Sequence, residues 1–212
     1  MTQLWIPGWQ FDSEVFEPLW LAMGLDTQPV LSYSQFTGSR EEWLQQTVDQ
    51  LPENTTLVGW SLGGLLACEL AMRSDKVVKV LVLNSSSQFV GRYGLQECFA
   101  RDFASNYRKD AIHTRKRFSR LLSSINAFKL LPLMLDTDQS SYLSWLFQID
   151  ITRSKVPCPV HVLLAEADQL VPVFPASTGW RNIAESITTM PGEHTLLWQN
   201  PDAVVRWIGM HE

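Results

Sequence analysis

Short apolar runs rich in β-branched residues alternate along this chain with longer stretches whose apolar residues recur at helical spacing. Six runs fit strands, over residues 3–6, 29–33, 55–60, 77–83, 160–165 and 186–190. Helical patterns fit residues 11–23, 39–51, 62–73, 176–184 and 201–207. Such an alternation is typical of a mostly parallel sheet with helices on both faces, because parallel neighbours need a crossover connection. We therefore predict an α/β fold with a sheet of about six strands.

The helix expected over residues 39–51 has clear signals at both ends. Ser39 is a good N-cap, and Glu41 and Glu42 place carboxylates in the first turn, where they favour the positive end of the helix dipole. Pro52 follows the last turn and would stop the helix.

The pattern changes between residues 86 and 154, where helical, aromatic and basic residues dominate and no convincing strand occurs. A stretch of roughly 70 residues is too long for a plain loop in a compact domain. We therefore expect residues 86–154 to form a helical lid insertion above the sheet, within a single domain that spans residues 1–212.

Composition restricts the class of protein further. With 212 residues and 45% hydrophobic content the chain can bury one substantial core. A net charge of −5 argues against wholesale attraction to nucleic acid or to an anionic membrane. The three cysteines lack the paired spacing of zinc or redox sites, the N-terminus does not resemble a signal peptide, and no run is apolar enough to cross a bilayer. These features favour a soluble, cytoplasmic protein without a metal.

The strongest chemical signal is the run Gly-Trp-Ser-Leu-Gly around Ser61, which matches the pattern G-x-S-x-G. It lies between an expected buried strand and an expected helix, the context in which a sharp turn exposes the hydroxyl of a nucleophilic serine. Gly59 and Gly63 would let neighbouring backbone approach that turn closely. The alternative is a capping serine in a glycine-containing turn.

A serine hydroxyl needs an imidazole base, and the base needs a carboxylate to orient it. Among the four histidines, His194 follows the last expected strand on a loop, whereas the other three lie in the insertion, within a strand or near the end of the chain. Asp168 lies just beyond the strand 160–165, at the sheet edge where catalytic groups gather in open α/β sheets. Glu166 and Asp150 are weaker candidates for the acid, and Asp168 could instead only form a turn.

The negative charge that develops on the substrate oxygen needs hydrogen-bond donors, each worth about 3 to 4 kcal/mol. We expect the backbone N–H of Leu62, directly after Ser61, to be one donor. The second should come from the loop after the first strand, where Pro7 has no N–H and Trp9 is the suitable residue. Trp9 could alternatively be only a core aromatic.

These motifs, in this order, resemble the α/β-hydrolase superfamily over nearly the whole chain. The closer likeness is to the pimeloyl-acyl-carrier-protein methyl ester carboxylesterases of biotin synthesis. It is carried by Gly8-Trp9 with Ser-Glu-Val-Phe at residues 13–16, and by Gly-Trp-Ser-Leu-Gly-Gly-Leu at residues 59–65. The resemblance implies Ser61 as nucleophile, His194 as base, Asp168 as its orienting acid, and Trp9 with Leu62 as oxyanion donors.

The chain departs from that family in two respects. Pro7-Gly8 stands where the oxyanion loop usually has His-Gly. The sequence also begins almost at this loop, so we expect the sheet to lack the two antiparallel strands that open the full fold.

The insertion adds an argument about the substrate. Residues 101–120 contain seven basic and two acidic side chains, a local charge of +5 in a chain whose net charge is −5. Such a surface could dock an acidic acyl carrier protein, and the resembled family uses lid arginines in this way. The candidate carrier-binding residues are Arg108, Lys109, Arg115, Lys116, Arg117 and Arg120. The alternative is an ordinary solvated helix face.

Apolar residues of the insertion should pack it onto the sheet and line an acyl tunnel; these are Phe99, Phe103, Tyr107, Phe118, Leu121, Leu122 and Ile125. Together the signals favour a serine carboxylesterase that hydrolyses the methyl ester of pimeloyl-acyl carrier protein without cofactor or metal. A broader ester or thioester hydrolase, or a carbon–carbon lyase on the same triad, stays open, as does a non-catalytic hydrolase-like binding module.

Overall fold

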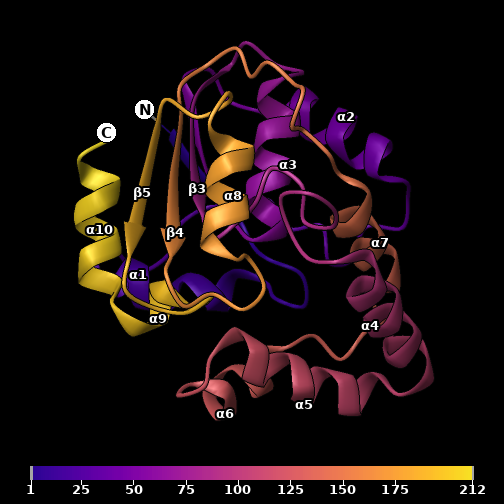
Figure 1. Cartoon of the computed structure of the whole chain (residues 1–212). Helices are drawn as coiled ribbons and strands as arrows, with labels where there is room; N and C mark the ends of the chain where they lie inside the picture. The colour runs from indigo at the N-terminus through magenta and orange to yellow at the C-terminus, as the bar shows by residue number, and fades with distance from the viewer. Residues whose placement is uncertain (1, 212) are drawn as a thin grey trace.

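The computed structural model describes residues 2–211 and contains one five-stranded parallel sheet (Figure 1). Its strands are β1 (Thr2–Ile6), β2 (Thr55–Trp60), β3 (Val77–Leu83), β4 (Val160–Ala165) and β5 (Ser186–Met190), and they lie side by side in chain order. Strands β2 and β4 are buried along their whole length, as expected for strands covered on both faces. Because all five strands are parallel, the residues that directly follow each strand lie at the same edge of the sheet.

The sheet has five strands, and the expectation of a strand over residues 29–33 was wrong. That segment makes only an isolated bridge, in which Trp5 pairs with Val30 through hydrogen bonds to Pro29 and Leu31. Pro29 has no N–H to extend the ladder. The chain then turns inward, because the hydroxyl of Ser32 donates to Asp12 and Tyr33 is buried.

Helices cover both faces of the sheet. Helices α1 (Glu17–Ala22) and α10 (Pro201–Gly209) pack together on one side, and α3 (Leu62–Ala71) and α8 (Val173–Trp180) lie on the other (Figure 1). Helix α2 (Arg40–Gln50) contacts α3 and begins with the expected cap, completed by a reciprocal hydrogen bond between Ser39 and Glu42. Only part of the helix expected over residues 11–23 is α-helical, because a 3₁₀ turn, η1 (Ser13–Phe16), precedes Pro18.

Residues 86–154 form helices and no strand, with two isolated bridges near their ends. The helices are α4 (Glu97–Lys109), α5 (Ala111–Leu122), α6 (Ala127–Leu130) and α7 (Ser140–Gln148), with the 3₁₀ turn η2 (Leu131–Leu133) after α6. In Figure 1 the helices α4, α5 and α6 lie beyond the arrowheads, at the carboxyl edge of the sheet. None of the helices in residues 2–211 has the length and apolar character needed to cross a bilayer.

Candidate active site

Ser61 occupies a strained turn between β2 and α3. Its backbone has φ +56° and ψ −120°, a conformation that residues other than glycine rarely adopt. Its N–H donates to the carbonyl oxygen of Leu83 on the neighbouring strand. The residue is 6% exposed. Backbone strain of this kind concentrates at functional sites because the surrounding structure must hold it in place.

Two glycines make this turn possible through close approach of backbone. A Cβ on Gly59 would collide with the carbonyl group of Gly63, and a Cβ on Gly63 would collide with the carbonyl group of Ile6 at the end of β1. Gly8 lies against Ser61 itself, since a Cβ on Gly8 would stand 3.0 Å from Cβ of Ser61. The loop after β1 therefore passes directly over the turn at Ser61.

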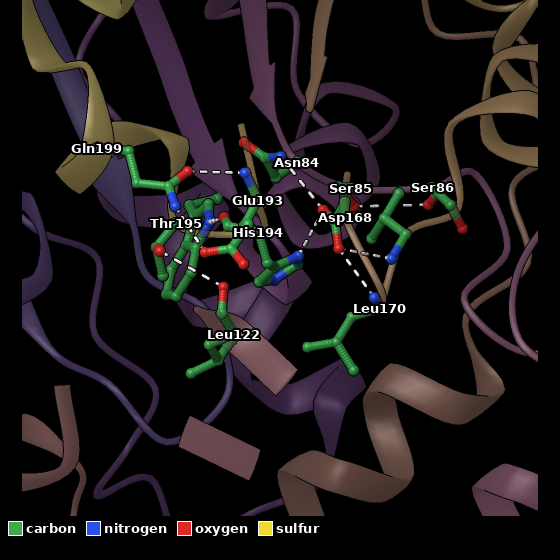
Figure 2. Close-up of polar contacts among 12 residues, drawn as sticks. Asn84, Ser85, Ser86, Leu122, Asp168, Leu170, Glu193, His194, Thr195 and Gln199 are labelled. Carbon is green, nitrogen blue, oxygen red and sulfur yellow. Dashed lines mark hydrogen bonds and ion pairs between the residues drawn. The ribbon is translucent and has the colours of Figure 1, made fainter. Parts of the chain in front are cut away.

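His194 and Asp168 meet at the same edge of the sheet, from loops after β5 and β4. The imidazole Nδ1 of His194 lies 2.8 Å from Oδ2 of Asp168, and both side chains are buried (Figure 2). The rival acids Glu166 and Asp150 are exposed. Of the other histidines, His113 is exposed, and His161 stacks on His211 near the amino ends of the strands. The structure thus brings together the two residues that the sequence favoured as base and acid.

Four donors surround the Asp168 carboxylate and fix its orientation. The backbone N–H groups of Leu170 and Val171 each donate to Oδ1 at 2.9 Å, and Oδ2 accepts from His194 and, at 3.2 Å, from Nδ2 of Asn84 (Figure 2). Asn84 is buried, follows β3 directly, and has a left-handed backbone with φ +47°. Sequence reasoning missed it, although an asparagine at the carboxyl end of a central strand was a usable signal.

The remaining ring nitrogen of His194 is buried without a hydrogen-bond partner among residues 2–211. If Nδ1–H donates to Asp168, Nε2 is the unprotonated nitrogen that can accept a proton. The imidazole also lies close to the Ser61 turn: its ring centroid is 5.3 Å from that of Trp60, whose indole N–H donates to the His194 carbonyl oxygen at 3.0 Å. The hydrogen bond from Ser61 to Nε2 stays a prediction, because Nε2 has no hydrogen-bond partner within residues 2–211.

The two expected oxyanion donors are both positioned at the Ser61 turn. Leu62 is the first residue of α3, so its N–H has no acceptor within the helix and lies at the positive end of the helix dipole. The backbone N–H of Trp9 donates to no backbone oxygen in residues 2–211. The Trp9 side chain is a buried aromatic, 2% exposed, packed against Phe103 and Phe118. The ring of Trp9 is thus a core aromatic, and the role of its amide as an oxyanion donor stays a prediction.

The six candidate carrier-binding residues divide into two groups. Five are exposed, namely Arg108, Lys109, Lys116, Arg117 and Arg120. Arg115 differs, because its side chain is 13% exposed, forms a 2.7 Å ion pair with Asp136 and donates to the carbonyl oxygen of Leu135. Arg115 thus ties α5 to the chain after η2, and we remove it from the candidate carrier-binding surface.

Most of the apolar residues expected to pack the insertion onto the rest of the fold are buried or contact the core. Phe103, Tyr107, Phe118 and Leu122 are buried, and Phe99 and Leu121 pack against the core. Ile125 does not, since it is 70% exposed at the corner between α5 and α6.

Comparison with known proteins identifies relatives of the whole fold. A model of the alpha/beta hydrolase family matches residues 4–207. Two solved structures superimpose on nearly all of the chain: a lipase-esterase related protein from Clostridium acetobutylicum (TM-score 0.79, 18% identity, 99% of this chain and 93% of that one) and an esterase from Exiguobacterium antarcticum (TM-score 0.80, 14% identity, 100% and 91%). At these identities the likeness shows the fold.

Curated relatives have names from one area of metabolism. The pimeloyl-[acyl-carrier protein] methyl ester esterase of Nitrosospira multiformis is 38% identical over 104 residues, 46% of this chain and 40% of that protein. The biotin biosynthesis bifunctional protein of Cellvibrio japonicus is 27% identical over 94% of this chain and 45% of its own length. A Legionella pneumophila esterase with the first name is 29% identical over 54% and 52%. The matches thus span about half of these relatives' lengths or less.

Proposed function

Because the chain belongs to the alpha/beta hydrolase family, we propose that it is a serine carboxylesterase with Ser61 as nucleophile, His194 as base and Asp168 as the acid that orients it. The observation that carries this proposal is the buried pair of His194 and Asp168, in which Nε2 has no partner within residues 2–211 and the imidazole packs on Trp60, the residue before Ser61. A hydrolase fold without catalysis would have no need to hold a buried imidazole in this way.

In the proposed reaction, Oγ of Ser61 attacks the ester carbonyl carbon while His194 takes the hydroxyl proton. The carbonyl oxygen becomes an oxyanion that accepts hydrogen bonds from the N–H groups of Trp9 and Leu62. His194 then gives its proton to the leaving alcohol, which leaves an acyl group on Ser61. Water, deprotonated by His194, attacks the acyl-enzyme and releases the carboxylic acid, while the proton returns to Ser61. Asp168 accepts the hydrogen bond from Nδ1 of His194 and stabilises the imidazolium whenever it forms.

The substrate we propose is the methyl ester of pimeloyl-acyl carrier protein, so that hydrolysis releases methanol and a free carboxylate. The names of the curated relatives support this choice. Residues 86–154 would act as a lid within one domain, with the exposed cations of α4 and α5 facing an acidic carrier protein. A cytoplasmic location stays a prediction.

The test is a comparison of three substrates on one purified protein. We expect kcat/KM to be higher for the pimeloyl-carrier methyl ester than for p-nitrophenyl acetate or a matched acyl thioester. Equal turnover of all three would favour a broad hydrolase and remove the specific substrate. Growth of a biotin-requiring strain that lacks its own carboxylesterase, when supplied with this chain, provides the cellular counterpart.

A further inference from the structure

The loop that carries His194 is hydrogen-bonded to the corner between α5 and α6 through Glu193. The Glu193 carboxylate accepts a hydrogen bond from the backbone N–H of Ser124 at 3.0 Å and one from Oγ of Ser123 at 2.9 Å. It also accepts from Nε2 of Gln199 at 2.6 Å, and the Glu193 N–H donates to Oε1 of the same glutamine at 2.7 Å (Figure 2). One carboxylate thus joins the loop, helix α9 (Leu196–Gln199) and the inserted segment.

A second contact holds the other side of the histidine. The Thr195 hydroxyl donates to the carbonyl oxygen of Leu122, the last residue of α5, at 3.4 Å. Both chain neighbours of His194 are therefore bonded to the end of α5, and Figure 2 shows Glu193, Thr195 and Leu122 around the imidazole. The Ser123 hydroxyl extends the link, because it accepts from the N–H of Asn126 at the start of α6.

The carboxylate is suited to such a link at neutral pH. Burial alone would raise the pKa of Glu193, but hydrogen bonds from Ser124, Ser123 and Gln199 outweigh it and hold the pKa below its usual value. Glu193 is therefore ionised, and hydrogen bonds to an ionised acceptor are about twice as strong as those between neutral groups.

We propose that Glu193 is a positioning residue, which places His194 for proton transfer only while the corner between α5 and α6 is hydrogen-bonded to the loop that carries His194. We call this loop the base loop. The inference rests on the proposed function, since it concerns the base of that reaction. It makes the inserted segment part of the catalytic assembly as well as a cover over the site. Displacement of a catalytic group by about 1 Å can cost 100-fold in rate, so a small shift of this loop would matter.

The test uses Glu193→Ala and a charge-exchanged pair. Glu193→Ala should lower kcat for p-nitrophenyl acetate about 10- to 100-fold per titrated active site, with KM within about twofold, because ground-state binding of a small ester is untouched. Glu193→Gln should also lose activity, because in either orientation its NH2 group would face a donor, Nε2 of Gln199 or the N–H of Ser124. Adding Gln199→Glu restores donor and acceptor, so the double variant should recover most of kcat.

A matched control separates positioning from general stability. Glu42 also accepts from a backbone N–H and a hydroxyl, both of Ser39, at 2.7 and 2.8 Å, but it caps α2 far along the chain from the base loop. Glu42→Ala should lower the urea midpoint while leaving kcat per active site unchanged. Ser123→Ala should lower kcat in the wild-type background. It should have little further effect in Glu193→Ala, because both substitutions remove the same hydrogen bond between Ser123 and Glu193.

The outcomes distinguish this inference from the proposed function. A wild-type protein whose Ser61 does not react with a fluorophosphonate would overturn both. A reactive wild type whose Glu193→Ala variant keeps kcat within twofold would overturn the positioning role alone. So would failure of the exchanged pair to recover activity when it folds as stably as wild type.

Discussion

The indole N–H of Trp9 donates a hydrogen bond to the backbone carbonyl oxygen of Gln139 at 2.9 Å, across 130 positions of sequence. This bond joins the loop after β1 to the first turn of α7. The next residue, Gln10, strengthens the connection, because its amide donates to the hydroxyl of Tyr107 on α4 and its carbonyl oxygen accepts from the N–H of Leu135. The proposed oxyanion loop is thus held by the inserted segment, as the base loop is.

Trp9→Phe keeps an aromatic ring but removes the indole donor to the Gln139 carbonyl oxygen, which still accepts from the N–H of Leu143, so the lost hydrogen bond should cost about 0.5 to 1.5 kcal/mol. We expect a lower urea midpoint together with a fall in kcat, because the Trp9 amide loses its fixed position. Trp43→Phe is the control, since its indole also donates to a backbone carbonyl, that of Ser32, away from the site. If both variants lost stability but neither lost activity, the link would serve the fold only.

Asn84→Gly removes one donor to Asp168 while keeping a backbone that tolerates φ +47°. We expect kcat to fall about 10- to 100-fold, because loss of a hydrogen bond to a carboxylate costs about 1.5 to 3 kcal/mol and loosens the proposed acid that orients His194. Asn54→Gly is the matched control, with φ +57° at an exposed position. Steady-state kinetics of the two variants would show equal rates if the Asn84 contact were unimportant.

Reversing the exposed charges with Lys116→Glu and Arg117→Glu should lower kcat/KM for a carrier-bound ester about tenfold and spare p-nitrophenyl acetate. Added salt should reduce the difference in kcat/KM for the carrier-bound ester between wild type and the charge-reversed variant, because the ions screen attraction between the enzyme and the carrier. The control is Arg153→Glu with Lys155→Glu, which makes the same change of net charge at residues that precede β4. Equal losses on both substrates would show that the cations of α5 maintain the fold instead.

The contact between His161 and His211 predicts a dependence of stability on pH. Burial lowers the pKa of both imidazoles; the charges of His211 and Lys79 lower that of His161 further, while Glu185 opposes them. The unfolded chain therefore binds protons more readily as the pH falls below about 6.5, which destabilises the folded state. We expect the urea midpoint to be steady above pH 7 and to fall towards pH 5.5. In His161→Gln this fall should be smaller; an unchanged profile would contradict the assignment.

The local motifs explain why the catalytic candidates could be predicted from sequence. Ser61 lies between a strand and a helix, with a glycine two positions away on either side, so the sequence signal for its turn lies within one window of the chain. Asp168 follows the buried strand β4 and His194 follows the edge strand β5, and parallel strands bring such positions to one edge regardless of their separation. Their contact therefore follows from topology, whereas their exact distance does not.

The missed features depend on contacts between distant segments. The strand expected over residues 29–33 failed because Tyr33 turns into the core, which no local pattern shows. Arg115 looked like its exposed neighbours on α5, and only its pairing with Asp136 distinguishes it. Glu193 stands beside the proposed base, yet its role depends on Ser123 and Ser124, about 70 positions earlier.

The central claim is that Ser61 is a nucleophile activated by His194, and covalent labelling tests it most directly. A fluorophosphonate probe followed by peptide mass spectrometry should find one adduct, on Ser61, in the folded wild-type protein and none in Ser61→Ala. His194→Ala should slow labelling at least about 100-fold, the usual contribution of a general base. No adduct on folded wild-type protein, or equal labelling rates with and without the imidazole, would contradict the claim.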